Sequence, residues 1–254
     1  MFRGLEKKKL YTFERIWFPS KEVSSNADII RYLRSYKPSC GFFSINEKIE
    51  TVITDLTISK DDLLMNASKT VRYEVNKCEK EDITISFYTA KDLSINIDLI
   101  NEFEGAYLDF AKTIQVKMVD DAYSRLKILN QIESGTIMLS KAEKDGVSVY
   151  HVYFCGGKES CLCYSVSNYR DDISKKNLAG RMNKLLHLKD MEWFKENGYT
   201  LYDWGNISNS ETPNGIDKFK MSFGGNVVTV YNSFVGNTIK GKLLVLAYKI
   251  KEAL

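Results

Sequence analysis

The sequence predicts an α/β protein, and three observations support that prediction. Hydrophobic residues make up 44% of the 254 residues and charged residues 27%, which is the balance of ordinary globular domains. Aromatic residues reach 12%, while the chain has only 3 prolines, so strands and helices are favoured over long irregular segments. Alternating and helical hydrophobic spacings follow one another along the chain. A chain of this length can hold one large domain or two small ones.

The N-terminal part gives mixed signals. Residues 15–19 form an aromatic, basic segment that suggests a loop, and residues 26–36 are compatible with a short helix. Alternation over residues 48–58 predicts a strand. Ser59, with an acidic side chain three residues later, predicts the start of a helix whose apolar positions continue to Cys78.

From residue 83 onward the pattern is more regular. Turns are expected at Asp145-Gly146 and Gly156-Gly157, and Gly198 is expected to end a long helix. The predicted strands are 83–88, 136–142, 147–154, 159–167, 199–204 and 226–234, and the predicted helices are 96–113, 120–132, 177–197 and 215–223.

Composition narrows the functional classes. The net charge of +3 comes from 36 basic and 33 acidic residues that are interspersed, which argues against DNA as a partner. Five cysteines and no secretory segment after Met1 indicate a reducing, cytoplasmic location. The longest apolar run, residues 243–248, is far shorter than the roughly 18 residues of a membrane span, so a soluble protein without membrane insertion is expected. No Cys/His pair complements Cys161 and Cys163, so no metal is expected.

Three late motifs suggest a family. They are Arg181-x-Asn183-x-Leu-Leu-His187, then Tyr202-Asp-Trp-Gly205-x-Ile207, then Gly215-Ile-Asp-Lys-Phe-Lys220-x-x-Phe-Gly-Gly225; Arg72-Tyr-Glu-Val-Asn-Lys77 adds a weaker match. With the element order β-α-α-β-β-β-α-β-α-β over residues 83–234, they resemble the GNAT acyltransferase fold in its FemABX-related branch. That branch includes aminoacyl transferases of peptidoglycan bridges and sugar N-acyltransferases.

The resemblance implies a mixed, mostly antiparallel central sheet flanked by helices. Residues 81–254 would form the GNAT-like domain, and residues 1–80 a reduced N-terminal subdomain, the truncated remnant of a second unit that longer members carry. The apparent lack of a full second unit, and of the long helical arm of some tRNA-dependent members, favours the single-unit sugar N-acetyltransferases and makes tRNA an unexpected partner.

The expected function is therefore transfer of acetyl from acetyl-CoA to the amine of a nucleotide-linked amino sugar, a surface polysaccharide precursor, by direct attack. Two alternatives remain open. One is an aminoacyl-tRNA-dependent transferase of the peptidoglycan-bridge type. The other is a non-catalytic GNAT-like module that binds RNA or protein.

The expected cofactor site lies at the start of the helix near residues 174–180. Free N–H groups and the positive end of the helix dipole suit a pyrophosphate, although an ordinary capped helix is the alternative. By resemblance, the end of the preceding strand would hold the pantetheine and place an N–H near the thioester oxygen; a normally paired strand end is the alternative. The predicted cofactor-binding residues are Ser165, Val166, Ser167, Lys175, Lys176, Asn177, Gly180 and Arg181.

Three residues are candidates for the chemistry. Asp203 closes a strand and would accept a proton from the amine, or cap the next turn. By resemblance Lys220 would lie near a donor or acceptor phosphate and Tyr231 would protonate the thiolate, with a solvated lysine and plain packing as the alternatives. For His187 and His151, the sequence favours hydrogen-bonded packing roles over a role as catalytic base.

The substrate site is expected to combine aromatic and basic side chains. Stacking and charge would hold a nucleotide base and its diphosphate, although several of these residues are equally compatible with core and surface positions. The predicted substrate-binding residues are Trp17, Phe18, Arg72, Tyr73, Trp204, Asn206 and Phe219.

Overall fold

The computed structural model describes residues 2–7, 10–21, 23–113, 125–169 and 172–253. They form two compact units. Unit 1 comprises Met1–Val52, Asn206–Asp217 and Val227–Leu254, and unit 2 comprises Ile53–Gly205 and Lys218–Asn226. The boundary expected at residue 80 falls inside unit 2, because the end of the chain returns to the N-terminal strands.

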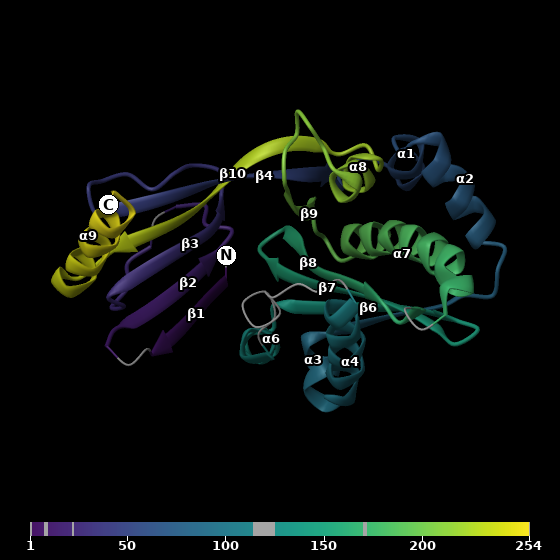
Figure 1. Ribbon diagram of the computed structural model, residues 1–254, viewed down its shortest axis with the longest axis horizontal. Coiled ribbons are helices and arrows are strands. Elements are labelled where there is room, and N and C mark those ends of the chain that lie inside the picture. The colour runs from purple at the N-terminus through teal and green to yellow at the C-terminus, as the bar shows by residue number, and fades with distance from the viewer. Residues whose placement is uncertain (1, 8–9, 22, 114–124, 170–171, 254) are drawn as a thin grey trace. The chain divides into compact units, whose positions relative to one another are not determined.

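Unit 1 is built on strands in the order β1-β2-β3-β10-β4 (Figure 1). The β2–β3 pair is parallel, whereas β1–β2 and β3–β10 are antiparallel. A small core of Ile16, Ile30 and Tyr32 lies on one face of these strands. The strands are β1 (Phe2–Lys7), β2 (Thr12–Trp17), β3 (Ile29–Ser35), β4 (Ser44–Asp55) and β10 (Asn226–Gly236), and helix α9 (Ile239–Ala253) follows β10.

Two predictions for this region are wrong. Residues 26–36 contain strand β3 rather than a helix, and β2 extends through Trp17, where a loop was expected. The β-branched Ile29 and Ile30 favour a strand, and neighbours on both sides supply the hydrogen bonds. Those neighbours, β2 and β10, come from segments whose proximity no local pattern reveals.

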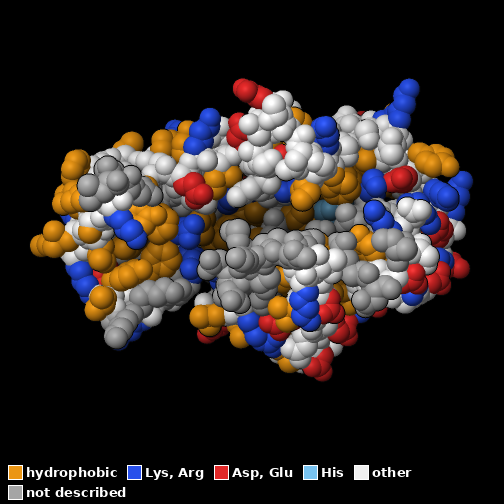
Figure 2. Space-filling model, in the orientation of Figure 1, with side chains coloured by type: hydrophobic (Ala, Val, Ile, Leu, Met, Phe, Trp, Pro, Cys, Tyr) orange, Lys and Arg blue, Asp and Glu red, His pale blue; other side chains and the backbone are white. Residues whose placement is uncertain are grey.

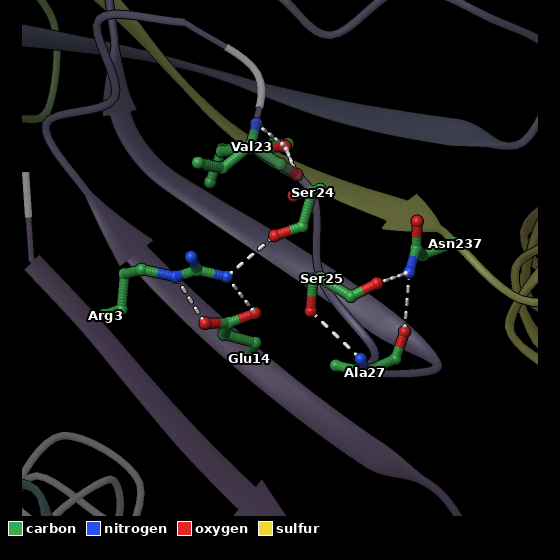
Figure 3. A network of polar contacts seen from close by, with 8 residues as sticks. Arg3, Glu14, Val23, Ser24, Ser25, Ala27 and Asn237 are labelled. Atoms are coloured by element: carbon green, nitrogen blue, oxygen red, sulfur yellow. Dashed lines mark hydrogen bonds and ion pairs between the residues drawn. The ribbon is translucent and has the colours of Figure 1, made fainter.

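A polar network ties the segment between β2 and β3 to the sheet (Figure 3). The Arg3 guanidinium forms a bidentate ion pair with Glu14, with distances of 2.7 and 3.0 Å, and also donates to the Ser24 carbonyl at 2.9 Å. The Asn237 amide donates to the carbonyls of Ser25 and Ala27 at 2.7 and 3.0 Å. The backbone of this connection is therefore held by side chains from both ends of the chain.

Unit 2 is built on the order β9-β8-β7-β6-β5, with the end of β4 beside β9. All pairs from β8 to β5 are antiparallel, and β8–β9 is parallel. Helix α7 covers one face, with α1 and α2 packed against it, while α3, α4 and α6 lie on the other (Figure 1). The strands are β5 (Thr84–Thr89), β6 (Ile137–Lys144), β7 (Val147–Gly156), β8 (Glu159–Ser167) and β9 (Leu201–Ile207).

The helices of this region are α1 (Lys60–Met65), α2 (Lys69–Cys78), α3 (Ala90–Ile95), α4 (Asp98–Thr113), α6 (Arg125–Glu133), α7 (Lys176–Glu196) and α8 (Gly215–Met221), with a 3₁₀ turn, η2 (Ile173–Lys175), before α7. Ser59 caps α1 as predicted, accepting from the Asp62 N–H. The expected single helix is broken before Ser68, which caps α2. The start of the helix predicted over 120–132 lies outside the described residues.

The predicted α/β fold class, a mostly antiparallel sheet flanked by helices, is confirmed. The turn at Asp145-Gly146 has positive φ at both residues, 49° and 73°, as the expected two-residue hairpin requires. Gly198, with φ of 82°, follows the end of α7. In the part of the chain that the structure describes, no helix is long and apolar enough to cross a membrane.

Candidate functional site

The parallel ladder between β8 and β9 is short. It runs from Glu159, opposite Leu201, to Cys161, opposite Asp203. Immediately beyond it, Gly205 adopts φ of 75°, and a Cβ at this position would lie 2.8 Å from the Leu162 carbonyl oxygen. The two strands thus remain close for one more step, and this close approach requires a glycine.

Past the end of that ladder, β8 pairs with β7 alone among the described strands. Ser165, Val166 and Ser167 lie opposite His151, Tyr150 and Val149. A register shift precedes this stretch, because Val152 faces Tyr164 while Tyr153 faces Leu162, which makes Cys163 an extra residue. Such a bulge bends the strand. The outer backbone edge of residues 165–167 therefore lies where an extended ligand could add hydrogen bonds; the predicted cofactor binding by these residues stays a prediction.

Lys220 lies beside the end of the β8–β9 ladder, and Phe219 precedes it in α8. The Lys220 ammonium is 3.7 Å from the position that a Cβ of Gly205 would occupy. The Phe219 ring packs 5.6 Å from His187 and 5.4 Å from Phe223. Unit 2 thus places the predicted lysine close to the end of the β8–β9 ladder.

Asp203 is buried in β9, with 2% of its surface exposed. Its Oδ1 accepts a hydrogen bond from the Gly205 N–H at 2.9 Å. This is the turn-capping contact that was one of the two alternatives for Asp203; its role as proton acceptor stays a prediction. Trp204, also buried, donates its indole N–H to Thr54 at 2.9 Å and stacks near Phe223, which is a packing role.

An acidic side chain caps the 3₁₀ turn η2 that precedes α7, whereas the N-cap residue of α7 itself, Lys175, makes no capping side-chain hydrogen bond. Asp172 Oδ1 accepts from the Ser174 N–H at 3.0 Å, and hydrogen bonds from Ser174 hold the pKa of Asp172 below its usual value despite partial burial. Lys175 lies 3.7 Å from Asp172.

The other residues of this helix start that were predicted to bind the cofactor either contact neighbouring residues or face solvent. Arg181 forms an ion pair with Glu81 at 3.0 Å and donates to the Asn177 carbonyl. Lys176 is exposed, and a Cβ at Gly180 would meet no atom within 4 Å. Pyrophosphate binding at this helix start stays a prediction, with Arg181 already held by Glu81.

A buried polar network, which the sequence did not predict, lies between β7, β9 and α7. His151 Nδ1 is 2.6 Å from Asp190 Oδ2, and the Tyr153 hydroxyl donates to the same oxygen at 2.5 Å. Tyr202 lies 2.7 Å from Tyr153 and 2.8 Å from His187 Nδ1. All five side chains are at most 1% exposed.

At one end of the network, the hydrogen-bond partners determine which atom of each pair donates. The Tyr153 hydrogen points to the Asp190 carboxylate, so Tyr202 donates to Tyr153, and His187 Nδ1 donates to Tyr202. Nδ1 of His187 therefore carries a hydrogen, and burial favours the neutral ring, whose lone pair is then on Nε2. Burial, aided by the nearby His151, Lys220 and Lys184, holds the pKa of His187 well below its usual value. Burial likewise raises the pKa of Tyr202 well above its ordinary value.

At its other end, the network reaches β8. His151 Nε2 lies 2.7 Å from Asn183 Oδ1, which also accepts from the exposed Ser165 hydroxyl at 3.1 Å. Asp190 Oδ1 is buried with no hydrogen-bond partner among the described residues. The network thus connects the predicted ligand edge at Ser165 with the ring of His187.

Three members of the network come as close as metal ligands would. Donor atoms of His151, His187 and Asp190 lie within 4.8 Å of one another. Hydrogen bonds already occupy both nitrogens of His151 and Nδ1 of His187, however, and the charges of Lys184 and Lys220 act on His187. These residues therefore fit a hydrogen-bond network better than a cation.

A sequence signal for the network existed. Asn183, His187 and Asp190 recur at helical spacing on one stripe of α7, and His151 and Tyr153 alternate on β7. Local spacing placed each set on one face. Only the packing of α7 on the sheet brings the two sets together.

The other predicted residues are spread over both units. In unit 2, Arg72 donates to the carbonyls of Met65 and Ala67 at 2.8 and 2.6 Å, and Tyr73 is 68% exposed. In unit 1, Phe18 is buried, with φ of 50° and its ring 5.9 Å from Trp17. Tyr231 lies in β10 next to a register shift, half-buried.

Unit 1 has a polar hollow of its own. It has a volume of about 460 Å³ and is lined by residues 48–50 and 206–211. Asn206, a predicted substrate-binding residue, is exposed there, and its Oδ1 accepts from the buried Arg34 at 2.5 Å. Asn206 is thus positioned by a cation within unit 1.

Comparison with known proteins bears on the fold. No family model and no curated protein sequence matches the chain. Among solved structures, FemX matches over 95% of this chain and 85% of its own, with a TM-score of 0.58 and 13% identity. The C-terminal domain of a putative lysylphosphatidylglycerol synthetase from Agrobacterium fabrum matches over 87% and 72%, with a TM-score of 0.51 and 13% identity.

A conserved protein of unknown function from Bacteroides thetaiotaomicron also matches, over 92% of this chain and 85% of its own, with a TM-score of 0.51 and 10% identity. At such identities the likeness concerns the fold. The likeness to FemX covers almost the whole chain, so it includes the N-terminal strands as well as residues 81–254. The expected FemABX-like form of the GNAT fold is confirmed.

Proposed function

We propose that the chain transfers an activated acyl group of the aminoacyl type to an amine or hydroxyl acceptor. The observation that carries this proposal is the outer edge of residues 165–167 at the end of the β8–β9 ladder, with the Lys220 ammonium beside the same ladder end. A carbonyl bound along such an edge accepts hydrogen bonds from backbone N–H groups, which stabilise the developing oxyanion.

An aminoacyl donor is favoured over coenzyme A for two reasons. Two of the cations expected to hold a pyrophosphate have acidic partners, since Lys175 lies 3.7 Å from Asp172 and Arg181 is paired with Glu81. The solved structures that share the fold include FemX and a domain of a putative lysylphosphatidylglycerol synthetase, whose name describes lysyl transfer to a lipid. Exposed Lys69, Lys77 and Lys80 on or beside α2 suit contacts to the phosphates of a tRNA.

The reaction balances without a protein base. The acceptor nitrogen or oxygen bonds to the acyl carbon, the ester C–O bond of the donor breaks, and the proton lost by the acceptor ends on the departing ribose oxygen. Lys220 stabilises negative charge during this exchange. The network around His187 does not contact the substrate, because its rings are buried; it fixes β7, β9 and α7 around the site.

Acetyl transfer from acetyl-CoA to a nucleotide-linked amino sugar is the second candidate. Its specific support is the exposed Lys176 together with the open space around Gly180 at the start of α7. In that reaction the proton would end on the thiolate of coenzyme A.

One experiment separates the two candidates. Purified protein is incubated with radiolabelled aminoacyl-tRNA and either a peptidoglycan precursor peptide or phosphatidylglycerol vesicles, and in parallel with acetyl-CoA and UDP- or dTDP-amino sugars. Transfer of label from tRNA supports the first candidate, and thiol release supports the second. If neither occurs, both are contradicted.

Substitution of Lys220 tests the proposed site, with Lys218 as the control. Lys220→Ala is expected to lower kcat/KM by about 10²-fold, the scale of losing one charge-stabilising donor. Lys218→Ala, an exposed lysine two residues earlier in α8, is expected to leave kcat/KM unchanged. Equal effects of the two substitutions would remove Lys220 from the site.

A further inference from the structure

Helix α9 packs on unit 1 through one narrow face. Gly241 lies so close to Asp28 that a Cβ would be 1.7 Å from its carbonyl oxygen, and Val245 is 3% exposed. Both residues therefore point towards the body of unit 1. Lys242 and Lys249 add contacts with the Phe43 ring and the Phe42 carbonyl.

A second apolar face lies opposite. Ile239, Leu243 and Ile250 are 80%, 62% and 55% exposed, and Leu246, half-buried, completes the row. At 3.6 residues per turn these four side chains fall within a sector of about 60°. We call them the α9 stripe. A surface helix of a globular protein ordinarily has a single apolar face, so packing within unit 1 does not explain this stripe.

Lysines border the α9 stripe on both sides. On the helical projection Lys242 and Lys249 lie on one side and Lys240 and Lys251 on the other. Lys249 also donates to the Phe42 carbonyl at 2.7 Å, which places the 68% exposed Phe42 next to the helix. Figure 2 shows hydrophobic and basic side chains intermixed over the part of unit 1 that carries α9.

We propose that α9 is an interfacial helix that docks unit 1 on an anionic lipid surface. Apolar side chains flanked by lysines match the two layers of such a surface: the stripe enters the acyl boundary, and the ammonium groups reach the anionic headgroups. Of the four lysines, Lys240 has an anionic neighbour, Asp28, at 3.8 Å. The other three are therefore the main electrostatic contributors.

The charges also favour a lipid over a second copy of the chain. Two α9 helices packed stripe to stripe would bring their flanking lysines together, and like charges across an interface oppose association. The inference depends only on α9 and its surroundings in unit 1. It holds or fails independently of the proposed transferase activity.

Co-sedimentation with vesicles tests the proposal. The protein is expected to bind phosphatidylcholine vesicles that contain phosphatidylglycerol, to bind pure phosphatidylcholine much more weakly, and to lose binding as salt rises. The double variant Leu243→Gln/Ile250→Gln is expected to lower the partition coefficient by at least about tenfold. Lys242→Gln and Lys251→Gln are each expected to lower it about fivefold.

The matched control is Leu126→Gln. Leu126 lies in α6 of unit 2 and is 61% exposed, nearly the same as Leu243 at 62%, so its substitution removes about as much apolar surface elsewhere as the Leu243→Gln substitution alone. Circular dichroism checks that all variants are folded, and transfer to a water-soluble acceptor is expected to be unchanged in the stripe variant.

Two results would overturn the proposal. One is binding that shows no preference for phosphatidylglycerol, or that falls equally in Leu126→Gln and the stripe variant. The other is concentration-dependent dimerisation in sedimentation velocity that the stripe variant abolishes while vesicle binding is absent, which would assign the stripe to a second copy.

Discussion

His151 and Asp190 lie 39 residues apart in the sequence and 2.6 Å apart in unit 2, with both side chains fully buried. Strand β7 supplies the histidine and helix α7 the carboxylate. Because the Tyr153 hydroxyl donates to the same carboxylate oxygen, this contact joins the helix to the sheet at one polar point within an apolar core. Burial of this kind makes every member of the network costly to remove.

Asp190→Asn is expected to lower the free energy of unfolding by roughly 3 kcal/mol, because it replaces a charged acceptor of two buried donors. Urea titration measures the change as a lower midpoint at constant m-value. Asp109→Asn is the control, since Asp109 is 65% exposed in a surface ion pair with Lys112 and should change stability by less than about 0.5 kcal/mol. Similar losses of unfolding free energy in both variants would show that the network contributes no more to stability than a surface ion pair.

The stability of the fold is expected to decrease as the pH falls below about 6.5. Burial holds the pKa of His187 well below that value in the folded chain, so the unfolded chain binds the proton first. Below pH 6.5 this difference removes about 1.4 kcal/mol of stability per pH unit until the folded pKa is reached.

The contribution of His187 can be isolated, because the chain has only two histidines. His187→Gln should reduce the pH slope of the unfolding free energy between about pH 5 and 6.5 by about one proton. Urea titrations at several pH values measure the unfolding free energy, and the slope of this free energy against pH is compared between the variant and the original chain. An unchanged slope would mean that His187 titrates normally in the folded state.

Gly205→Ala is expected to destabilise unit 2 by about 2–4 kcal/mol, through a left-handed conformation and a contact with the Leu162 carbonyl. Gly198→Ala is the matched control. Gly198 has a similar φ of 82°, but a Cβ there would meet no atom within 4 Å, so only the conformational cost of about 1–2 kcal/mol is expected. In thermal unfolding, Gly205→Ala should therefore have the lower melting temperature of the two variants. Equal melting temperatures would contradict the close approach of β8 and β9.

Arg72→Ala is expected to lower the free energy of unfolding by about 1–2 kcal/mol, because the guanidinium satisfies the carbonyls of Met65 and Ala67 between α1 and α2. Tyr73→Ala removes an exposed ring and should leave stability nearly unchanged. Denaturant titration distinguishes a structural Arg72 from one that acts only on a ligand: in the latter case stability would be retained and only substrate affinity would fall.

Local patterns predicted the middle of the chain well. The bounds of β8 and the hairpin turn at Asp145-Gly146 follow from alternation and from turn residues that tolerate positive φ. These features depend on neighbours within a few residues.

Strands β1 to β3 and helix α9 were not predicted, because their stability depends on distant partners. Strand β3 is held between β2 and β10, and its Ile29 lies opposite Gly236, more than two hundred residues later. The apolar content of α9 is divided between two opposite faces, so it shows no single helical stripe for a sequence pattern to detect.

The sequence by itself determined the order of the strands β5 to β10, the ends of α7 and β8, and the fold class, because these follow from hydrophobic period and turn chemistry. Only the tertiary structure decided that His151 and Tyr153 contact Asp190 and that Tyr202 links them to His187. It also decided that Asp172 bonds Ser174 before α7 and that Glu81 pairs with Arg181, one of the residues expected to bind the cofactor. The physical reason is that sheet register and helix docking are set by packing between segments far apart in the chain.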